Sequence, residues 1–538
     1  MRYVAFAVSI AGMVVFAVIA SVHTMSIIGV SAQWIAAFFA VLTALGIWDI
    51  AQTKHALRRN YPILANLRFL LEKVRPEIRQ YFLESDLDGT PFNRIKRAVV
   101  YQRAKGVLET RPFGTQQNVY ALDFEWLAHT LSPAKVGSHD FRVTVGGPAC
   151  QKPYSISLFN ISAMSFGSLS ANAIRALNKG ARLGGFAHDT GEGGYSQYHR
   201  EFGGDIIWEI GSGYFGCRKP DGSFCAETFA AAASNPQIKM IEIKLSQGAK
   251  PGHGGVLPGR KVSAEIAAAR AVPQGQDCVS PAAHSAFSTP LEMMGFIARL
   301  RELSGGKPVG FKLCIGQKSE FMALCKAMLE SGIAPDFIVI DGKEGGTGAA
   351  PLEFTDHLGY PLREGLTFAH NCLVGAGLRD KIRIGASGRI VTAFDIARTL
   401  ALGADWCNAA RGFMFALGCV QSLTCHTDHC PTGVATQNNL RQRAIVVPDK
   451  AERVMRFHER TLDSLAELIA AAGLSHPGDL RKERIMRRVS QTQIASFAEI
   501  YPEIAPGSLL RGDADPAYIQ LWASADAATF QAKSFADA

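Results

Sequence analysis

The sequence predicts a (β/α)8 barrel, with a transmembrane helical hairpin before it and a helical C-terminal extension after it. Three observations predict this fold. Short apolar segments alternate with helical stretches through the middle of the chain, which is the pattern of a parallel barrel. Two long apolar runs occur near the N-terminus, and each is long enough to cross a hydrocarbon core as a helix. Beyond residue 445 the pattern is helical, notably over Ala451–Ala472.

The barrel is expected over residues 154–445, with helices after most of its strands. The eight strand candidates are Ser155–Asn160, Phe186–His188, Met240–Leu245, Cys278–Ser280, Val309–Leu313, Phe337–Ile340, Lys381–Gly385 and Trp406–Ala409. The connection Ala187–Ile238 is longer than the others and rich in glycine. We therefore interpret it as an insertion over the barrel mouth.

Composition limits the classes of function. A chain of 538 residues is long enough for two or more structural units and a large core. The net charge of +9 is modest, and no basic block is interleaved with aromatic residues, so nucleic acid is not an expected partner. The eleven cysteines are scattered along the chain, which favours thiols and metal ligands in a reducing compartment over a disulfide framework.

The hairpin is expected within residues 1–52. Val4–Val22 carries no charge, and the second run, Ser31–Trp48, follows after a short link. A cleaved signal peptide is one alternative, but the first apolar run is too long for one and the second follows at once. A pair of soluble helices buried in the protein is the other alternative.

Basic residues follow the hairpin at Lys54, Arg58 and Arg59. The excess of basic residues on the cytoplasmic side of membrane proteins then predicts an anchor in the cytoplasmic membrane with the body of the chain in the cytoplasm. Residues 53–153 are expected to form a juxtamembrane lead-in, partly helical and partly irregular. Residues 446–538 form the expected C-terminal extension.

Three cysteines, Cys419, Cys425 and Cys430, are spaced C-x5-C-x4-C and are followed directly by a proline. Thiolates are the ligands of iron–sulfur clusters, and three close cysteines suit a cluster with three cysteinyl corners. Zinc is an alternative, because His426 or His429 could supply the fourth ligand that a structural zinc site requires. Three unrelated buried cysteines are the remaining interpretation.

The residues from Cys430 to Gln437 read CPTGVATQ. This motif, the cysteine spacing and the preceding barrel pattern resemble the FMN-binding synthase domain of glutamate synthase, in its short membrane-anchored form without the glutaminase domain. The resemblance covers about Tyr154–Ala471. It implies FMN as a cofactor and an iron–sulfur cluster, most simply 3Fe–4S, on the three cysteines.

The ligands of such a barrel lie on the loops at the C-terminal ends of the strands. Glycines in these loops expose backbone N–H groups that can cradle an anion, and arginines can pair with a phosphate. Surface ion pairs are the alternative role for the arginines. By resemblance and loop position, the expected FMN-binding residues are Ala163, Met164, Ser165, Lys312, Gly345, Gly346, Thr347, Gly388, Arg389, Ala410 and Arg411.

Two of the charged residues are candidates for catalysis. Lys312 lies inside an apolar strand, where a charge is costly without a partner, and near a flavin it could stabilise the reduced ring or hold a substrate carboxylate. A structural lysine is the alternative. Glu192 lies between glycines after the second strand and could bind ammonium or relay a proton. A solvated loop acid is the alternative for this residue.

The resemblance implies reductive amination of 2-oxoglutarate with ammonia to L-glutamate. The second residue is Arg2 and not the nucleophilic cysteine of the family's glutaminase domain. Ammonia is therefore expected from solution, or from glutamine through a partner glutaminase. The expected electron donor is ferredoxin, a reductase subunit or a membrane quinone. A related FMN enzyme acting on another amine, as in N-methylglutamate synthesis, and a non-catalytic electron-transfer subunit are the alternatives.

Overall fold

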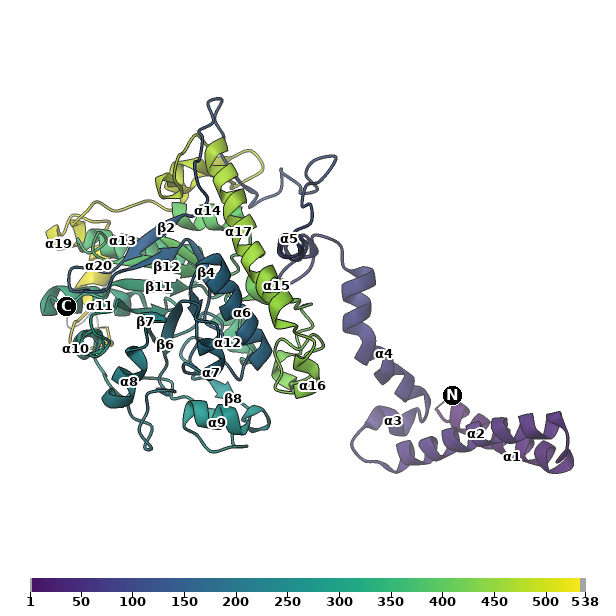
Figure 1. The fold of residues 1–538 in the computed structure, drawn as a ribbon. Coiled ribbons are helices and arrows are strands. Elements are labelled where there is room, and N and C mark those ends of the chain that lie inside the picture. Colours follow the sequence, from purple (N-terminus) through teal and green to yellow (C-terminus); the bar gives the residue numbers. More distant parts are fainter. Residues whose placement is uncertain (1, 533–538) are drawn as a thin grey trace. The chain divides into compact units, whose positions relative to one another are not determined.

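The computed structural model describes residues 2–532 and contains two separately packed units (Figure 1). The first unit extends to Pro91 and the second begins at Phe92. The boundary therefore lies inside the lead-in expected over residues 53–153.

Two apolar helices form most of the first unit. They are α1 (Val4–Val22) and α2 (Ile27–Ala51), and their mean hydropathies are 2.5 and 1.9. They pack against each other, with a hydrogen bond of 3.1 Å from the hydroxyl of Thr43 to that of Ser9. Most of their outward-facing apolar side chains are exposed. Both helices are thus long and apolar enough to cross a membrane by length and composition.

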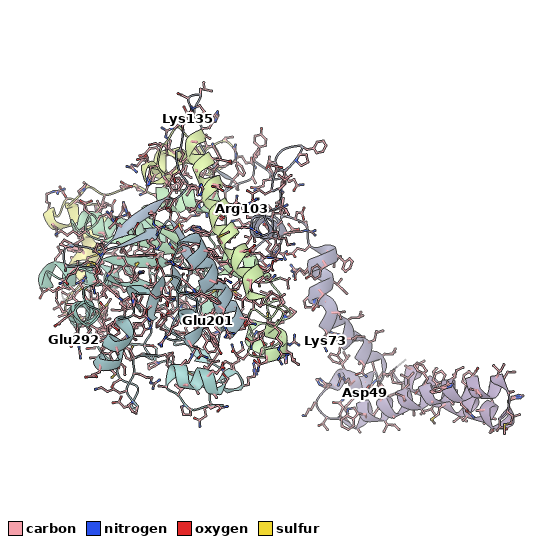
Figure 2. All side chains as sticks on the ribbon, viewed as in Figure 1. Asp49, Lys73, Arg103, Lys135, Glu201 and Glu292 are labelled. Atoms are coloured by element: carbon pink, nitrogen blue, oxygen red, sulfur yellow. The ribbon has the colours of Figure 1, made fainter. Side chains whose placement is uncertain are left out.

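The first unit continues with α3 (Ala56–Asn60), α4 (Leu64–Ile78) and a π-helical turn over Arg79–Leu83. Asp49, near the end of α2, is fully buried (Figure 2). Its carboxylate accepts hydrogen bonds from the backbone N–H of Ile63 at 3.0 Å and the side chain of Asn66 at 2.5 Å. A buried carboxylate needs such partners, and these bonds fix the start of α4 to the end of α2.

Eight parallel strands in the second unit close into a barrel, as the sequence predicts. In chain order they are β4 (Phe159–Ile161), β5 (His188–Asp189), β6 (Ile206–Ile210), β7 (Ile238–Lys244), β10 (Val309–Leu313), β11 (Phe337–Asp341), β12 (Arg383–Ser387) and β13 (Trp406–Ala409). The ring closes where Ala409 of β13 pairs with Ile161 of β4.

The third strand of the barrel differs from the prediction. β6 lies inside the stretch that the sequence suggested was an insertion, whereas Cys278–Ser280 is not a barrel strand. β9 (Cys278–Val279) instead pairs antiparallel with β8 (Val256–Leu257) in the loop after β7. The physical reason is that short apolar runs look alike in a sequence. β6 was missed because a buried glutamate, Glu209, interrupts its apolar run. The run Cys278–Ser280 was chosen instead, although its Val279 is 63% exposed in the structure. The long connection over the mouth follows β7.

The first predicted strand is divided. β3 (Tyr154–Ser157) pairs antiparallel with β2 (Arg142–Val145), and only β4 enters the barrel. Helices surround the barrel as an outer layer (Figure 1). They are α6 (Ala171–Gly184), α8 (Ala226–Ala233), α10 (Pro290–Leu303), α11 (Lys318–Ser331), α13 (Leu362–Gly375), α14 (Ala393–Ala401) and α15 (Arg411–Leu417).

Shorter elements connect these layers. They are α7 (Gln197–Arg200), a 3-10 turn (Gly259–Lys261), α9 (Ala264–Arg270), α12 (Leu352–His357), a 3-10 turn (Cys425–Thr427) and α16 (Asn439–Gln442). The long helix α17 (Val447–Ala471) packs along α6 and places Phe457 against Phe159 of β4 and Phe413 of α15. The helical extension predicted from the sequence therefore helps to form the core.

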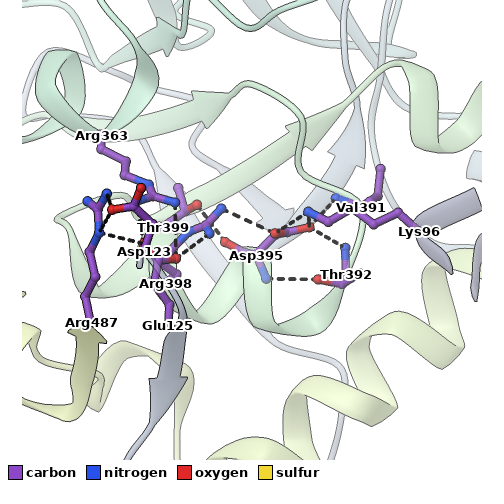
Figure 3. A network of polar contacts seen from close by, with 10 residues as sticks. All are labelled: Lys96, Asp123, Glu125, Arg363, Val391, Thr392, Asp395, Arg398, Thr399 and Arg487. Carbon is purple, nitrogen blue, oxygen red and sulfur yellow. Dashed lines mark hydrogen bonds and ion pairs between the residues drawn. The ribbon is translucent and has the colours of Figure 1, made fainter. Parts of the chain in front are cut away.

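The remaining C-terminal elements are two 3-10 turns (Pro477–Asp479 and Lys482–Arg484), β14 (Ile485–Arg488), β15 (Ile494–Ser496), α18 (Phe497–Ile500), α19 (Ser508–Arg511) and α20 (Pro516–Ser524). The lead-in segment β1 (Glu125–Leu127) pairs with β14. Glu125 also receives ion pairs from the barrel helices, including one of 2.8 Å from Arg398 of α14 (Figure 3). The segments that precede and follow the barrel in the sequence are thus joined to each other and to the barrel.

Candidate functional site

A buried ion cluster fills the barrel interior around Lys312. Its ammonium group contacts the carboxylate of Glu209, lies 3.2 Å from that of Glu242 and 4.0 Å from that of Asp189. These four residues come from β10, β6, β7 and β5, and none is more than 4% exposed. Inward-facing positions on neighbouring strands bring them together. A buried lysine requires a partner of opposite charge, and Lys312 has three such carboxylates around its one ammonium group.

The excess of negative charge in this cluster favours protonation. Burial raises the pKa of Glu242 to about 7 despite the attraction of Lys312, and burial together with the neighbouring carboxylates raises the pKa of Asp189. Burial disfavours the ammonium form of Lys312, but the carboxylates outweigh this effect and raise its pKa. The raised pKa values of Glu242 and Asp189 mean that protons offset part of the negative charge of the cluster.

A second ion cluster, of opposite balance, surrounds Glu192 in the loop after β5. The ammonium group of Lys244, at the end of β7, lies 2.9 Å from its carboxylate. Lys250 and Arg270, from the long connection after β7, also act on it electrostatically. A side chain at Gly255 would place its Cβ 2.2 Å from a carboxylate oxygen of Glu192, so a larger residue there would force this carboxylate to move.

Three cations therefore face one carboxylate in this second cluster. Burial disfavours ionisation of Glu192, but the cations together outweigh it and lower its pKa to about 2. Burial likewise lowers the pKa of Lys250, with a contribution from Lys244. Among the described residues, this cluster lacks the further anions that would balance its charge. It is suited to an anionic ligand.

Two arginines converge at the loops after β12 and β13. Arg411 donates to the backbone carbonyl of Glu344 at 2.5 Å, and a Cβ at Gly346 would lie 2.7 Å from its guanidinium. Burial lowers the pKa of Arg411 to about 10, and the like charge of Arg389 adds to this effect. Arg389 is exposed and adopts a left-handed backbone with φ of 50°. Asp341 and Glu344 act on Arg411 in the opposite direction and offset part of this positive charge.

The cysteine loop contains an unusual density of left-handed residues. Between Cys419 and Cys430, three non-glycine residues have φ near 60°, namely Gln421, Leu423 and Asp428. Such conformations are costly and gather at functional sites. The loop is held by hydrogen bonds to its carbonyls, including one of 2.9 Å from Lys261 to Cys425.

The three thiols lie close enough to influence one another. Burial raises the pKa of Cys419 to about 12, and the other two cysteines contribute to this rise. Burial acts on Cys430 in the same direction, but N–H groups of the following residues point at its sulfur and lower its pKa overall. N–H donors aimed at a sulfur favour the thiolate, which is the form that binds metal.

The cysteine loop is joined directly to the loop after β4. The side chain of Gln437 donates to the carbonyls of Gly167 and Leu169, at 3.0 Å each. The same loop after β4 contains Ala163, Met164 and Ser165, of which Met164 is buried. Arg270 donates to its Phe166 carbonyl at 3.2 Å. One loop therefore contacts both the cation cluster around Glu192 and the cysteine loop.

The structure thus brings most of the predicted residues to neighbouring loops at one end of the barrel, since each follows a parallel strand. These are Ala163, Met164, Ser165, Glu192, Gly345, Gly346, Thr347, Gly388, Arg389, Ala410 and Arg411. Lys312 lies below them, inside the barrel. Sequence reasoning assigned no chemistry to Lys244, Lys250 or Arg270. The charge of Lys244 at the end of an apolar strand was the signal that could have found it.

Comparison with known proteins places the chain in a family. A family profile described as the conserved region in glutamate synthase matches residues 138–475. The chain belongs to the glutamate synthase family. This is a family of oxidoreductases, and the chain is an enzyme of that kind.

Two relatives illustrate the range of similarity. A glutamate synthase large subunit-like protein of Bacillus subtilis, YerD, is 39% identical over 84% of this chain and 93% of its own length. An archaeal glutamate synthase [NADPH] of Methanocaldococcus jannaschii is 36% identical over 60% of each chain. The chain therefore matches nearly all of the first protein but only about three fifths of the second.

The matches among solved structures are more distant. A mutant flavocytochrome b2 with bound pyruvate is 11% identical, with a TM-score of 0.40 over 78% of this chain and 85% of that one. A mandelate oxidase with (S)-2-phenylpropionate is 14% identical, with a TM-score of 0.38 over 80% and 98%. Similarity at this level has no bearing on activity or ligands.

Proposed function

We propose that this protein is a membrane-anchored, glutamate-synthase-like oxidoreductase that converts 2-oxoglutarate and ammonia to L-glutamate with FMN and an iron–sulfur cluster. The observation that carries the proposal is the cluster of three cations around Glu192. 2-Oxoglutarate has two carboxylates, and this cluster has an excess of two positive charges over its one carboxylate. The family provides the reaction type and the site provides the match of charge.

The phosphate of FMN fits the loops after β12 and β13, where Arg389 and Arg411 lie. Arg389 and Arg411 repel each other, Asp341 and Glu344 offset part of their charge, and a phosphate beside the two arginines would relieve the remaining repulsion. Gly345, Gly346, Thr347, Gly388 and Ala410 would supply backbone around it. The loop of Ala163, Met164 and Ser165 would then lie against the ring. Bound FMN would supply hydride chemistry at the substrate.

An iron–sulfur cluster fits the cysteine loop. Three thiols influence one another there, and N–H groups point at the sulfur of Cys430. Hydrogen bonds to sulfur are a regular feature of cluster sites. The direct link from Gln437 to the loop after β4 would place the cluster beside the FMN site. We assign three ligands, Cys419, Cys425 and Cys430, and a 3Fe–4S cluster.

The protein's own groups would then bind and orient the reactants. Lys244, Lys250 and Arg270 would hold the substrate carboxylates, and Glu192, whose pKa is lowered to about 2, would bind ammonium as a carboxylate. Ammonia and the ketone lose water to give 2-iminoglutarate, and two electrons and two protons reduce this imine to L-glutamate. Lys312 remains a predicted catalytic residue that would act as a fixed positive charge beneath the ring, because its ammonium group is already held by Glu209.

We also propose the sources of electrons and nitrogen. One electron at a time would come from ferredoxin or a reductase subunit through the cluster. Ammonia would come from solution, or from glutamine through a partner glutaminase. Helices α1 and α2 would anchor the protein in the cytoplasmic membrane, with the enzyme body in the cytoplasm.

Steady-state formation of glutamate tests the reaction. Anaerobic protein in detergent is supplied with 2-oxoglutarate, ammonium and a reduced dye, and glutamate is quantified. We expect product with ammonium. Product with methylamine alone would favour an N-methylglutamate-type enzyme. No product with any amine, from protein that contains flavin and cluster, would leave only an electron-transfer subunit.

Substitution of a ligand tests the cluster. Cys425→Ser should abolish the brown absorbance and lower the iron content, because only three thiolates hold the proposed cluster. Cys225→Ser is the matched control, since this half-buried cysteine lies outside the loop. Unchanged iron in Cys425→Ser would show that our ligand assignment is wrong.

Deletion of residues 1–52 tests the anchor. The truncated protein should move from the membrane pellet to the soluble fraction, because most of the exposed apolar surface of α1 and α2 is removed. Retention in the pellet after a high-salt wash would contradict the proposal that the hairpin is the main anchor.

A further inference from the structure

The helix α5 (Arg94–Lys105) lies before the residues matched by the family profile, yet it contacts the cysteine loop directly. The phenol of Tyr101 donates to the backbone carbonyl of Cys419 at 2.6 Å. Just before the helix, the backbone of Phe92 exchanges two hydrogen bonds with the side chain of Gln421, at 3.2 and 3.0 Å. The start of the cysteine loop is therefore tied to the lead-in at two residues.

The same segment also reaches the proposed phosphate site. The guanidinium of Arg411 lies 4.7 Å from the centre of the Phe92 ring, in cation–π geometry. Phe92 is 2% exposed and packs edge-on against Phe415 of α15, as does Tyr101. A single buried aromatic side chain thus fixes Arg411 while its backbone fixes the cysteine loop.

Helix α5 is itself held firmly in place. Lys96 donates to the buried carboxylate of Asp395 on α14 at 3.1 Å (Figure 3). Near the other end, Arg103 donates to Thr461 and Ser464 of α17, at 3.2 and 2.8 Å. Val100 is fully buried between these contacts. The helix is therefore a rigid support and not a mobile linker.

Arg97 of α5 brings a positive charge to the cysteine loop. Arg97 lies one turn before Tyr101 on the same face of α5, and its side chain is buried, at 6% exposed. From this position it acts electrostatically on Cys419. In a buried environment such a charge is screened weakly. Net charge and hydrogen bonding around the sulfurs are the factors that set the potential of an iron–sulfur cluster.

We propose that α5 is part of the cluster site, in which Arg97 raises the reduction potential and Tyr101 positions Cys419. This inference rests on the proposed cluster. Reduction adds one negative charge to the cluster, so a nearby fixed cation stabilises the reduced form. Arg97 and Tyr101 are positioning residues, since they act through the cluster and its ligand and do not contact substrate.

The reduction potential of the cluster, followed by EPR during a redox titration of the full-length protein, tests this proposal. Arg97→Gln should lower the reduction potential by at least 59 mV, which corresponds to a tenfold change in the one-electron reduction equilibrium. Arg97→Lys keeps the charge and should restore most of the difference. Arg94→Gln removes the same charge from an exposed position one turn away on α5 and should leave the potential unchanged.

The outcomes separate the two proposals. A protein without iron or an EPR signal overturns the cluster itself. A normal cluster whose potential is the same in Arg97→Gln and wild type overturns the role of Arg97. Tyr101→Phe should alter the EPR line shape and speed cluster loss under air, and an unaltered line shape and lifetime would overturn the role of Tyr101.

Discussion

The barrel holds two ion clusters with opposite balances of charge. Around Lys312, three buried carboxylates face one cation, whereas around Glu192 three cations face one carboxylate. The first cluster lies on the strands inside the barrel, and the raised pKa values of Asp189 and Glu242 let protons offset its negative charge. The second lies at strand ends and loops, and its carboxylate stays ionised although Lys250 and Arg270 are also buried. The difference teaches that the sign of the surrounding charge decides whether a buried carboxylate holds a proton.

Removal of the central cation should have the largest effect. Lys312→Met leaves buried carboxylates without a partner and should lower the free energy of unfolding by about 3–5 kcal/mol. Denaturant titration in detergent, followed by circular dichroism, measures this loss. Wild-type stability in Lys312→Met would mean that the buried carboxylates do not depend on this cation, and the comparison would fail.

Lys307→Met tests whether the neighbouring carboxylates, and not burial alone, set the cost of losing a buried lysine. Lys307 is also buried, but its ammonium group donates to the backbone carbonyls of Ala233 and Asn235 and to no carboxylate among the described residues. Lys307→Met should therefore cost less stability than Lys312→Met. Equal losses would mean that burial of the side chain, and not the carboxylates, sets the cost.

Removal of a cation from the loop cluster should have a smaller effect, expressed in binding. Arg270→Gln should weaken 2-oxoglutarate binding by about 10- to 100-fold, the range for one charge-assisted hydrogen bond. Isothermal titration calorimetry with the oxidised protein measures this affinity. Lys219→Gln removes an exposed cation elsewhere and is the control. Unchanged affinity in Arg270→Gln would remove this arginine from the substrate site.

The pH dependence of stability should show the smallest effect, with opposite signs for the two clusters. The pKa of Glu242 is raised in the folded protein to about 7, so the folded state binds the extra proton. Stability should therefore fall as pH rises from about 4.5 to 7, and then level off. Glu242→Gln should flatten this slope. A rising slope in this window that Glu242→Gln leaves unchanged would contradict the assignment.

Glu192 should change the pH dependence of stability in the opposite sense to Glu242. Its pKa is lowered to about 2, so its contribution to stability is present above about pH 4.5 and is lost as pH falls toward 2. Glu192→Gln should remove this loss on the acid side and leave the slope between pH 5 and 7 intact. Unfolding midpoints measured across both windows for the two variants separate the clusters.

Sequence reasoning succeeded where the local pattern was distinctive. Seven of the eight barrel strands overlap a predicted segment, and the three spaced cysteines lie in one loop, as expected. It failed at β6, because the inward-facing Glu209 of that strand interrupts an apolar run, and its true partner lies about a hundred residues away. Lys244, Lys250 and Arg270 were overlooked because each is ordinary in its local sequence.

The sequence by itself determined the alternation of strands and helices, the two apolar helices, the cysteine spacing and the family, since each depends on neighbours along the chain. Only the tertiary structure decided which charges meet. It paired Lys312 with carboxylates of three other strands, gathered three cations around Glu192, and set α5 against the cysteine loop. The physical reason is that barrel closure and helix packing join residues that are distant in sequence, and electrostatic interactions depend on their distance and burial in space.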